Sequence, residues 1–202
     1  MPVIRPGDAP VQVGDGKTAT NRYKTEGLSS AGGLTQYGAY LETLYPGAQS
    51  SMCHWHTEED EFIYMLSGAL VVYEDGTATA VGPGDSVCFP AGEPKGHYLA
   101  NESLSEAQYL IVGTRASQDT VTYPDNDRVQ TVDREAGTRT WTTMDGVPSD
   151  NPYAKKVCPE CGHVFKGNGW DGIDAHWRSK HEDIMPYEKA WPLLKSDKYP
   201  SA

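Results

Sequence analysis

The feature that most constrains the fold of this chain is a pair of histidines one residue apart, followed closely by a glutamate. His54 and His56 flank Trp55, and Glu61 follows after four more residues. Side chains at positions i and i+2 of a β-strand point to the same face, so the two imidazoles can reach one point. Imidazole and carboxylate groups in one small space are typical ligands of a first-row transition metal. The stretch therefore predicts β-strands built around a metal ion.

The residues around this stretch indicate an all-β body. Between residues 34 and 113, short runs rich in β-branched and aromatic residues alternate with Gly, Pro and Asp turns, and no long helical pattern separates them. The pair Asp75 and Gly76 predicts a hairpin turn between two of these runs. Seven or eight such runs over about 80 residues predict a sandwich or a closed barrel.

A second constellation, from Gly84 to Asn101, completes the first, and the two together resemble the paired motifs of the cupin superfamily. The residues that carry the resemblance are His54, His56, Glu61 and Gly68 in the first motif, and Gly84, Pro90, Gly92, His97 and Asn101 in the second. The chain departs from the pattern in two loops, because Gly47 lies one residue too far from His54 and four residues, instead of two, separate Gly92 from His97. The resemblance covers roughly residues 30–115 and implies a cupin jelly-roll barrel with a metal inside.

The ligand set that the resemblance implies is three imidazoles and one carboxylate, from His54, His56, His97 and Glu61. Such a set suits Fe(II), Mn(II), Ni(II), Co(II) or Zn(II). Four protein ligands leave one or two open positions on a five- or six-coordinate ion, where substrate, water or O2 can bind.

Alternation along the strands also predicts which neighbours of the ligands face inward. Ile63 and Met65 should share the face of Glu61, and Met52 and Leu99 should share the face of the nearby histidines. These four apolar side chains are expected to form the wall of a substrate pocket. The residues expected to point out of the barrel are Trp55, Phe62, Tyr64 and Tyr98, and the two cysteines expected to be packed inside are Cys53 and Cys88.

A second metal site is indicated near the end of the chain. Cys158 and Cys161 form a C-x2-C pair, and His176 and His181 follow after 14 further residues with an x4 spacing. This resembles the Cys2His2 zinc finger, with two extra residues before the first histidine. The resemblance implies a small ββα unit with a structural zinc, and a disulfide between the two cysteines is the alternative.

The role of this unit is expected to be a structural clamp or a protein contact made by Trp170, Trp177 and Trp191. Nucleic acid is not an expected partner. Residues 1–150 hold 9 Lys and Arg against 21 Asp and Glu, so the attached body should repel phosphates. The single finger also lacks Arg or Asn at the helix positions that read bases.

These patterns predict four segments: an N-terminal arm over 1–30, a cupin barrel over 31–115, extended segments and a linker over 116–153, and the zinc-finger-like unit with a docked amphipathic tail over 154–202. The first residues show no signal-peptide pattern, and no run approaches the roughly 18 apolar residues of a membrane span. A cytoplasmic protein without a membrane partner is expected, and analogy with small cupins predicts a homodimer.

The function expected from the resemblance is a metal-dependent enzyme that acts on a small molecule. A dioxygenase or other oxidoreductase is favoured, with iron as the metal if O2 reacts, and an isomerase or lyase remains open because a fold does not select a reaction. The alternatives are a ligand-binding or sensor barrel whose zinc unit contacts a partner, and a structural protein in which both metals only stabilise the fold.

Overall fold

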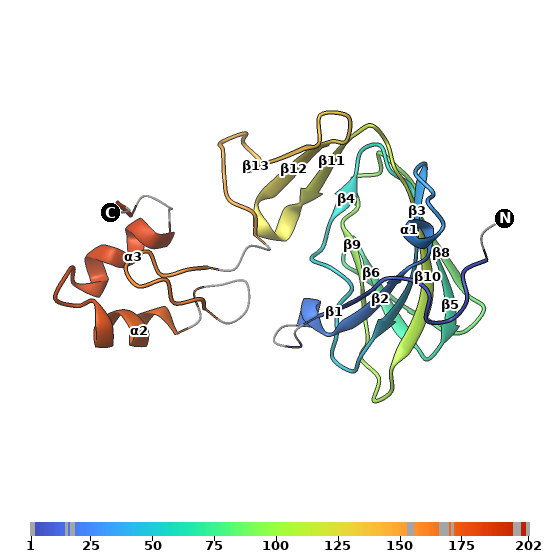
Figure 1. The fold of residues 1–202 in the computed structure, drawn as a ribbon, viewed down its shortest axis with the longest axis horizontal. Helices are drawn as coiled ribbons and strands as arrows, with labels where there is room; N and C mark the ends of the chain where they lie inside the picture. Colours follow the sequence, from blue (N-terminus) through green and yellow to red (C-terminus); the bar gives the residue numbers. More distant parts are fainter. Residues whose placement is uncertain are drawn as a thin grey trace. The chain divides into compact units, whose positions relative to one another are not determined.

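The computed structural model describes residues 3–14, 16, 19–152, 156–165, 170, 172–195 and 199–200 (Figure 1). The chain divides into two compact units, Met1–Asp150 and Asn151–Ala202. Among the described residues, no helix has the length and apolar character needed to cross a membrane.

The larger unit is built on a six-stranded antiparallel sheet with the order β1-β2-β3-β10-β5-β8. The strands are β1 (Val11–Val13), β2 (Tyr23–Gly27), β3 (Tyr37–Leu44), β5 (Glu61–Ser67), β8 (Ser86–Phe89) and β10 (Ala107–Thr114). The short helices α1 (Leu28–Ala31) and η1 (Ala19–Asn21) flank β2 in the chain. The longest pairing joins β10 to both β3 and β5, so β10 lies in the middle of this sheet.

Two smaller sheets complete the unit. One has the order β7-β6-β9 and consists of β6 (Leu70–Glu74), β7 (Thr77–Val81) and β9 (His97–Ala100). The other has the order β13-β12-β11-β4 and consists of β4 (Trp55–His56), β11 (Gln118–Tyr123), β12 (Arg128–Asp133) and β13 (Thr138–Thr142), with η2 (Pro124–Asn126) between β11 and β12. A bridge between His54 and His97 joins the start of β4 to β9.

The main core lies between the sheets. Its buried members come from both sides and are Leu44, Ala48, Ile63, Met65, Leu70, Val72, Phe89, Leu99, Ala107 and Tyr109. Burying such apolar surface is the main favourable term in folding. The predicted all-β jelly-roll architecture is confirmed, together with a small C-terminal appendage that contains helices.

Two local predictions rest on special backbone or side-chain requirements. The hairpin at Asp75 and Gly76 is confirmed, because both residues have positive φ angles (46° and 76°) and join β6 to β7. The second-motif residue Asn101 is buried, and its side chain donates to the carbonyls of Leu44 and Ser105, both at 2.8 Å. Asn101 is therefore a structural clamp between distant loops.

Three regions differ from the sequence-based expectations. The segment predicted as an arm contains β1 and β2, and β2 pairs along β3. The segment over 116–153, predicted as extended segments and a linker, contains the paired antiparallel strands β11, β12 and β13. Their Thr and Val residues favour strands, but interspersed charged and polar residues hide the alternation. Cys88 is exposed and not part of the core, since it lies on the outer face of the edge strand β8.

The smaller unit combines a bridge between Val157 and Val164 with the helices α2 (Ile173–Lys180) and α3 (Tyr187–Lys195). Its core contains Cys158, Phe165, Ile173, Trp177, Ala190 and Leu194. The tail residues Met185, Tyr187 and Trp191 pack against this core, so the amphipathic tail docks on its own unit. Trp177 is completely buried and donates its indole N–H to the Met185 carbonyl at 2.7 Å. The expected protein contact through Trp177 is therefore wrong.

Candidate metal centre

The four predicted ligands of the barrel come together at one point. One ligand atom from each of His54, His56 and Glu61 lies within 4.8 Å of the others. Nε2 of His97 lies 2.9 Å from Oε2 of Glu61, and Nε2 of His54 lies 3.9 Å from the same oxygen. Residues separated by more than forty positions thus face one small volume.

Strand pairing explains this convergence. The antiparallel bridge between His54 and His97 places these two residues opposite each other, and β4 carries His56 onward by two positions. Glu61 begins β5 in the facing sheet and points inward from there. The ring of Phe89 stacks on His97 with centroids 3.6 Å apart and planes 2° apart, which fixes the orientation of that imidazole.

Each of the three imidazoles turns Nδ1 toward a protein oxygen. Nδ1 of His54 lies 2.9 Å from the Met52 carbonyl, and Nδ1 of His97 lies 3.3 Å from the Lys95 carbonyl. Nδ1 of His56 donates to Oδ2 of Asp119 at 2.6 Å. For His54 and His56, a partner on Nδ1 selects the tautomer whose Nε2 lone pair is free for a metal. Nε2 of His97 is hydrogen-bonded to Glu61 and must lose its proton when a metal binds. The residues present therefore fit a divalent metal with imidazole and carboxylate ligands.

Asp119 is a site residue that sequence reasoning missed. It lies on β11 and is only 3% exposed. Its Oδ1 accepts the Glu58 backbone N–H at 3.0 Å and the Thr57 hydroxyl at 3.2 Å. Burial opposes ionisation, but the hydrogen bond from His56 and these donors lower the pKa of Asp119. Its position 63 residues after His56 gives no local sequence signal.

The charge states suit metal binding at neutral pH. Burial lowers the pKa of His54 to about 4, so its imidazole is neutral. Burial favours the neutral form of Glu61, but the hydrogen bond with His97 and the nearby imidazoles lower its pKa to about 2. A neutral imidazole and an ionised carboxylate are the forms that bind metals.

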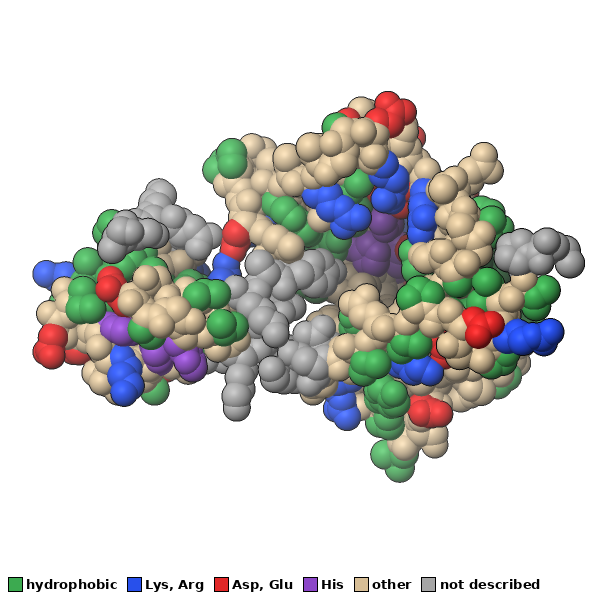
Figure 2. Space-filling view, in the orientation of Figure 1, with side chains coloured by type: hydrophobic (Ala, Val, Ile, Leu, Met, Phe, Trp, Pro, Cys, Tyr) green, Lys and Arg blue, Asp and Glu red, His purple; other side chains and the backbone are tan. Residues whose placement is uncertain are grey.

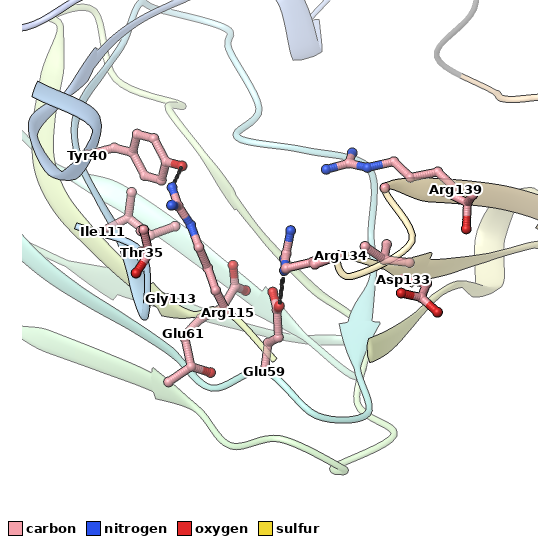
Figure 3. A pocket seen from close by; sticks show the side chains of 15 residues that line it. Thr35, Tyr40, Glu59, Glu61, Ile111, Gly113, Arg115, Asp133, Arg134 and Arg139 are labelled. Carbon is pink, nitrogen blue, oxygen red and sulfur yellow. Dashed lines mark hydrogen bonds and ion pairs between the residues drawn. The ribbon is translucent and has the colours of Figure 1, made fainter. Parts of the chain in front are cut away.

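An open cavity of about 810 Å³ lies beside Glu61. Figure 2 shows histidine side chains at the bottom of a hollow, with Lys and Arg side chains beside and above them. The cavity is lined by Thr35, Gly38, Tyr40, Glu59, Glu61, Ile111, Gly113, Thr114, Arg115, Val132, Asp133, Arg134, Gly137, Thr138 and Arg139. Figure 3 shows side chains from the barrel and from the β12–β13 hairpin pointing into this space.

Two glycines make room in front of Glu61. Gly113 of β10 is paired with Gly38 of β3 on one side and with Glu61 of β5 on the other. A Cβ on Gly38 would lie 2.7 Å from the Tyr40 ring, so a larger residue there would displace that ring. The missing side chains leave open space beside the candidate ligands.

The predicted pocket residues occupy other positions. Ile63, Met65 and Leu99 are almost fully buried in the core between the sheets, and none of them lines the cavity. Met52 is half-buried and does not line it either; its carbonyl holds His54. Alternation correctly places these side chains inward, but it cannot distinguish the packed end of a barrel from its open end.

The second predicted ligand set also comes together. One ligand atom from each of Cys158, Cys161, His176 and His181 lies within 4.8 Å of the others. Sγ of Cys161 is 3.4 Å from Nε2 of His176 and 3.3 Å from Nε2 of His181. Both cysteines are free thiols, so the alternative of a disulfide does not hold.

Comparisons with known proteins agree with this architecture. A family model described as a cupin domain matches residues 40–113. The crystal structure of a sugar phosphate isomerase from a cupin superfamily of Silicibacter pomeroyi DSS-3 is similar, with a TM-score of 0.67 and 36% identity over 74% of this chain and 97% of that one. A putative sugar phosphate isomerase from Acidithiobacillus ferrooxidans ATCC 23270 has a TM-score of 0.58 and 27% identity over 64% of this chain and 81% of that one. No curated protein sequence matches the chain. This chain spans 97% of the Silicibacter pomeroyi protein, which is 36% identical to it. The chain therefore belongs to the cupin superfamily.

Proposed function

We propose that this chain is a metal-dependent enzyme that isomerises a small phosphorylated sugar. The observation that carries the proposal is the opening of the candidate metal centre onto a cavity. Glu61 belongs both to the ligand cluster and to the wall of the 810 Å³ space. A ligand set that faces a cavity is typical of a catalytic metal, whereas a structural metal is closed off by protein.

The residues that would hold the metal are His54, His56, Glu61 and His97. A divalent metal at these side chains supplies a Lewis acid that polarises a carbonyl or hydroxyl oxygen of the substrate. Asp119 and the carbonyls of Met52 and Lys95 orient the imidazoles before substrate arrives. Such preorganisation matters because a ligand misplaced by about 1 Å can lose much of the rate.

Isomerase chemistry is preferred over the dioxygenase chemistry expected from the sequence. Both similar structures carry the name sugar phosphate isomerase, and one of them shares 36% identity with this chain. In addition, the cavity wall is rich in charged side chains. That composition suits a polar, anionic substrate better than an apolar one.

The test is direct. The purified protein should contain about one divalent metal per barrel and interconvert aldose and ketose forms of phosphorylated sugars, followed by NMR. His54→Ala should lose the barrel metal and the activity together, while Ser86→Ala, a change on an exposed strand residue, should keep both. O2 consumption without isomerisation would restore the dioxygenase assignment. Metal and ligand binding without turnover would favour the sensor alternative.

We also propose that Cys158, Cys161, His176 and His181 hold a structural zinc. The support is the cluster of two thiols and two imidazoles with buried Cys158 and His181. A unit this small gains much of its stability from metal binding.

A homodimer and a cytoplasmic location stay predictions. Analytical ultracentrifugation tests the homodimer, because a species that sediments at twice the mass of the chain would support it and a species at the mass of one chain would contradict it.

A further inference from the structure

The cavity concentrates positive charge in an acidic unit. Residues 1–150 contain 9 Lys and Arg against 21 Asp and Glu. Nevertheless, Arg115, Arg134 and Arg139 all line the same cavity, which Glu61 also lines. They come from three places in the chain: the end of β10, the end of β12, and β13. The composition of this acidic unit does not explain why three arginines line one cavity.

Arg115 is held in place by neutral groups. Its Nη2 donates to the Tyr40 hydroxyl at 2.9 Å, and its Nη1 donates to the Leu34 carbonyl at 3.4 Å. Within the described part of the chain, no carboxylate forms an ion pair with it. A guanidinium has five N–H donors, so several remain for a ligand. Arg115 therefore presents a fixed, uncompensated positive charge at the cavity wall.

The β12–β13 hairpin brings the other two arginines to the cavity (Figure 3). Arg134 is paired with Glu59, with Nη2 and Oε1 separated by 2.6 Å. Arg139 is exposed and has no carboxylate partner among the residues that the structure describes. Asp133 also lines the cavity, but its carboxylate accepts the Ala136 N–H at 2.8 Å and the Gln118 side-chain N–H at 3.2 Å. Among the residues that the structure describes, two of the three guanidinium groups thus lack an acidic partner.

We propose that Arg115 and Arg139 bind the phosphate group of the substrate while its sugar reaches the centre at Glu61, with Arg134 adding a third positive charge. This assignment rests on the proposed function and names the residues that would select a phosphorylated sugar. Guanidinium groups match phosphate oxygens with paired hydrogen bonds, and Arg115 is already oriented by Tyr40. Arg134 and Arg139 belong to the β12–β13 hairpin and Arg115 follows β10, so the hairpin and the end of β10 would supply the selectivity together.

The experiment measures binding without turnover. Isothermal titration of the metal-loaded full chain uses inorganic phosphate, glucose 6-phosphate, glucose and acetate as probes. Arg115→Gln and Arg139→Gln should each weaken phosphate and glucose 6-phosphate binding by about tenfold or more, as expected for a charge-assisted contact. Arg139→Lys should recover part of the loss. Arg5→Gln, which removes the same charge from an exposed residue outside the cavity, should change nothing.

Metal content measured on the same samples separates this inference from the proposed function. Arg115→Gln and Arg139→Gln should retain the barrel metal, whereas His54→Ala should lose it and still bind phosphate through the arginines. The proposal is overturned if the wild-type chain binds neither phosphate probe, if glucose or acetate binds as tightly as glucose 6-phosphate, or if both arginine variants bind like Arg5→Gln. Retained isomerase activity with any of these results would leave the proposed function standing and remove only the phosphate subsite.

Discussion

At the scale of single residues, the contact between His56 and Asp119 extends the site beyond the candidate ligands. The 2.6 Å hydrogen bond fixes the His56 ring, and the buried carboxylate makes the imidazole a better ligand. The aspartate itself is held by the backbone of Glu58. Asp119 would therefore control metal affinity without touching the metal.

Asp119→Ala should weaken binding of the barrel metal by about 10- to 100-fold, because the His56 ring loses its orienting partner. Competition with a chelator of known affinity measures the change. Asp133→Asn is the matched control, since Asp133 caps an exposed turn and faces no histidine nitrogen. Equal metal affinity of Asp119→Ala and the wild type would show that His56 is oriented by other contacts.

A second residue-scale feature is the carboxyl group of Glu42 inside the barrel. Burial raises its pKa to about 7, the charge of Glu61 adds to the increase, and the Tyr109 hydroxyl opposes it. Below pH 4.5 the group is protonated in both the folded and the unfolded chain. Between pH 4.5 and 7 the carboxyl is ionised in the unfolded chain but still protonated in the folded one, so the free energy of unfolding of the barrel decreases over this range and levels off above pH 7.

Urea unfolding of the metal-free protein should therefore show a loss of stability on the order of 2 to 3 kcal/mol between pH 4.5 and pH 8 from this group. Glu42→Gln should remove that part of the pH dependence and be more stable than the wild type at pH 8. Glu135→Gln, a change at an exposed turn, should leave the pH profile as it is. A profile that Glu42→Gln does not alter would place the titration elsewhere.

At the scale of elements, the paired glycines of β3 and β10 give the sheet an open place beside Glu61. Gly113 has ordinary space for a methyl group, because a Cβ there would lie 3.6 Å from the Asp60 carbonyl oxygen and 3.9 Å from Cγ of Glu61. A larger side chain would extend into the cavity. The two strands thus set how much open space lies beside the candidate ligand Glu61.

Gly113→Val should reduce kcat/KM by roughly tenfold or more, since each extra methylene group in a site of fixed shape has an effect of this size. The metal content should stay at the wild-type value, and Gly113→Ala should lie between the two. Gly82→Val, with nothing within 4 Å of its Cβ, is the matched control for adding bulk to a strand end. Unchanged kinetics in Gly113→Val would mean that substrate approaches from another side.

The sheet of β4, β11, β12 and β13 contributes several residues to the site. β4 supplies His56, β11 supplies Asp119, and the hairpin that follows supplies Arg134 and Arg139. One sheet therefore carries a candidate ligand, the residue that orients it, and two charges of the cavity. Its pairing brings residues 55–56 together with residues 118–142.

At the scale of the whole molecule, the chain consists of two compact units with separate cores. The larger unit contains the candidate ligands of the barrel, and the smaller unit contains the cluster of Cys158, Cys161, His176 and His181. Because the two ligand sets share no residue, each metal should bind independently of the other.

Cys158→Ser should lose the zinc and the fold of the smaller unit while the barrel metal stays bound. Metal analysis gives the zinc content, and near-UV circular dichroism follows the packing of Trp177, which is completely buried in that unit. His54→Ala should show the reverse pattern. Loss of both metals from the single cysteine change would mean that the two units fold as one.

The sequence by itself determined the features that depend on local spacing. The alternation around His54, the positive φ at Asp75 and Gly76, and the C-x-x-C pair follow from strand periodicity, turn chemistry and ligand chemistry. These are short-range rules, and from them come the all-β class and the grouping of His54, His56 and Glu61; His97 and the Cys2His2 set were implied by resemblance to known families.

Only the tertiary structure decided which distant residues meet. It placed Asp119 beside His56, put Ile63, Met65 and Leu99 in the packed core and not on the wall of the cavity beside Glu61, and brought the hairpin arginines to that wall. Strand periodicity predicts which face a side chain occupies. It does not predict where along the barrel the packed core gives way to the open cavity. Contacts across sixty or more residues depend on sheet pairing, and single-sequence spacing does not contain that information.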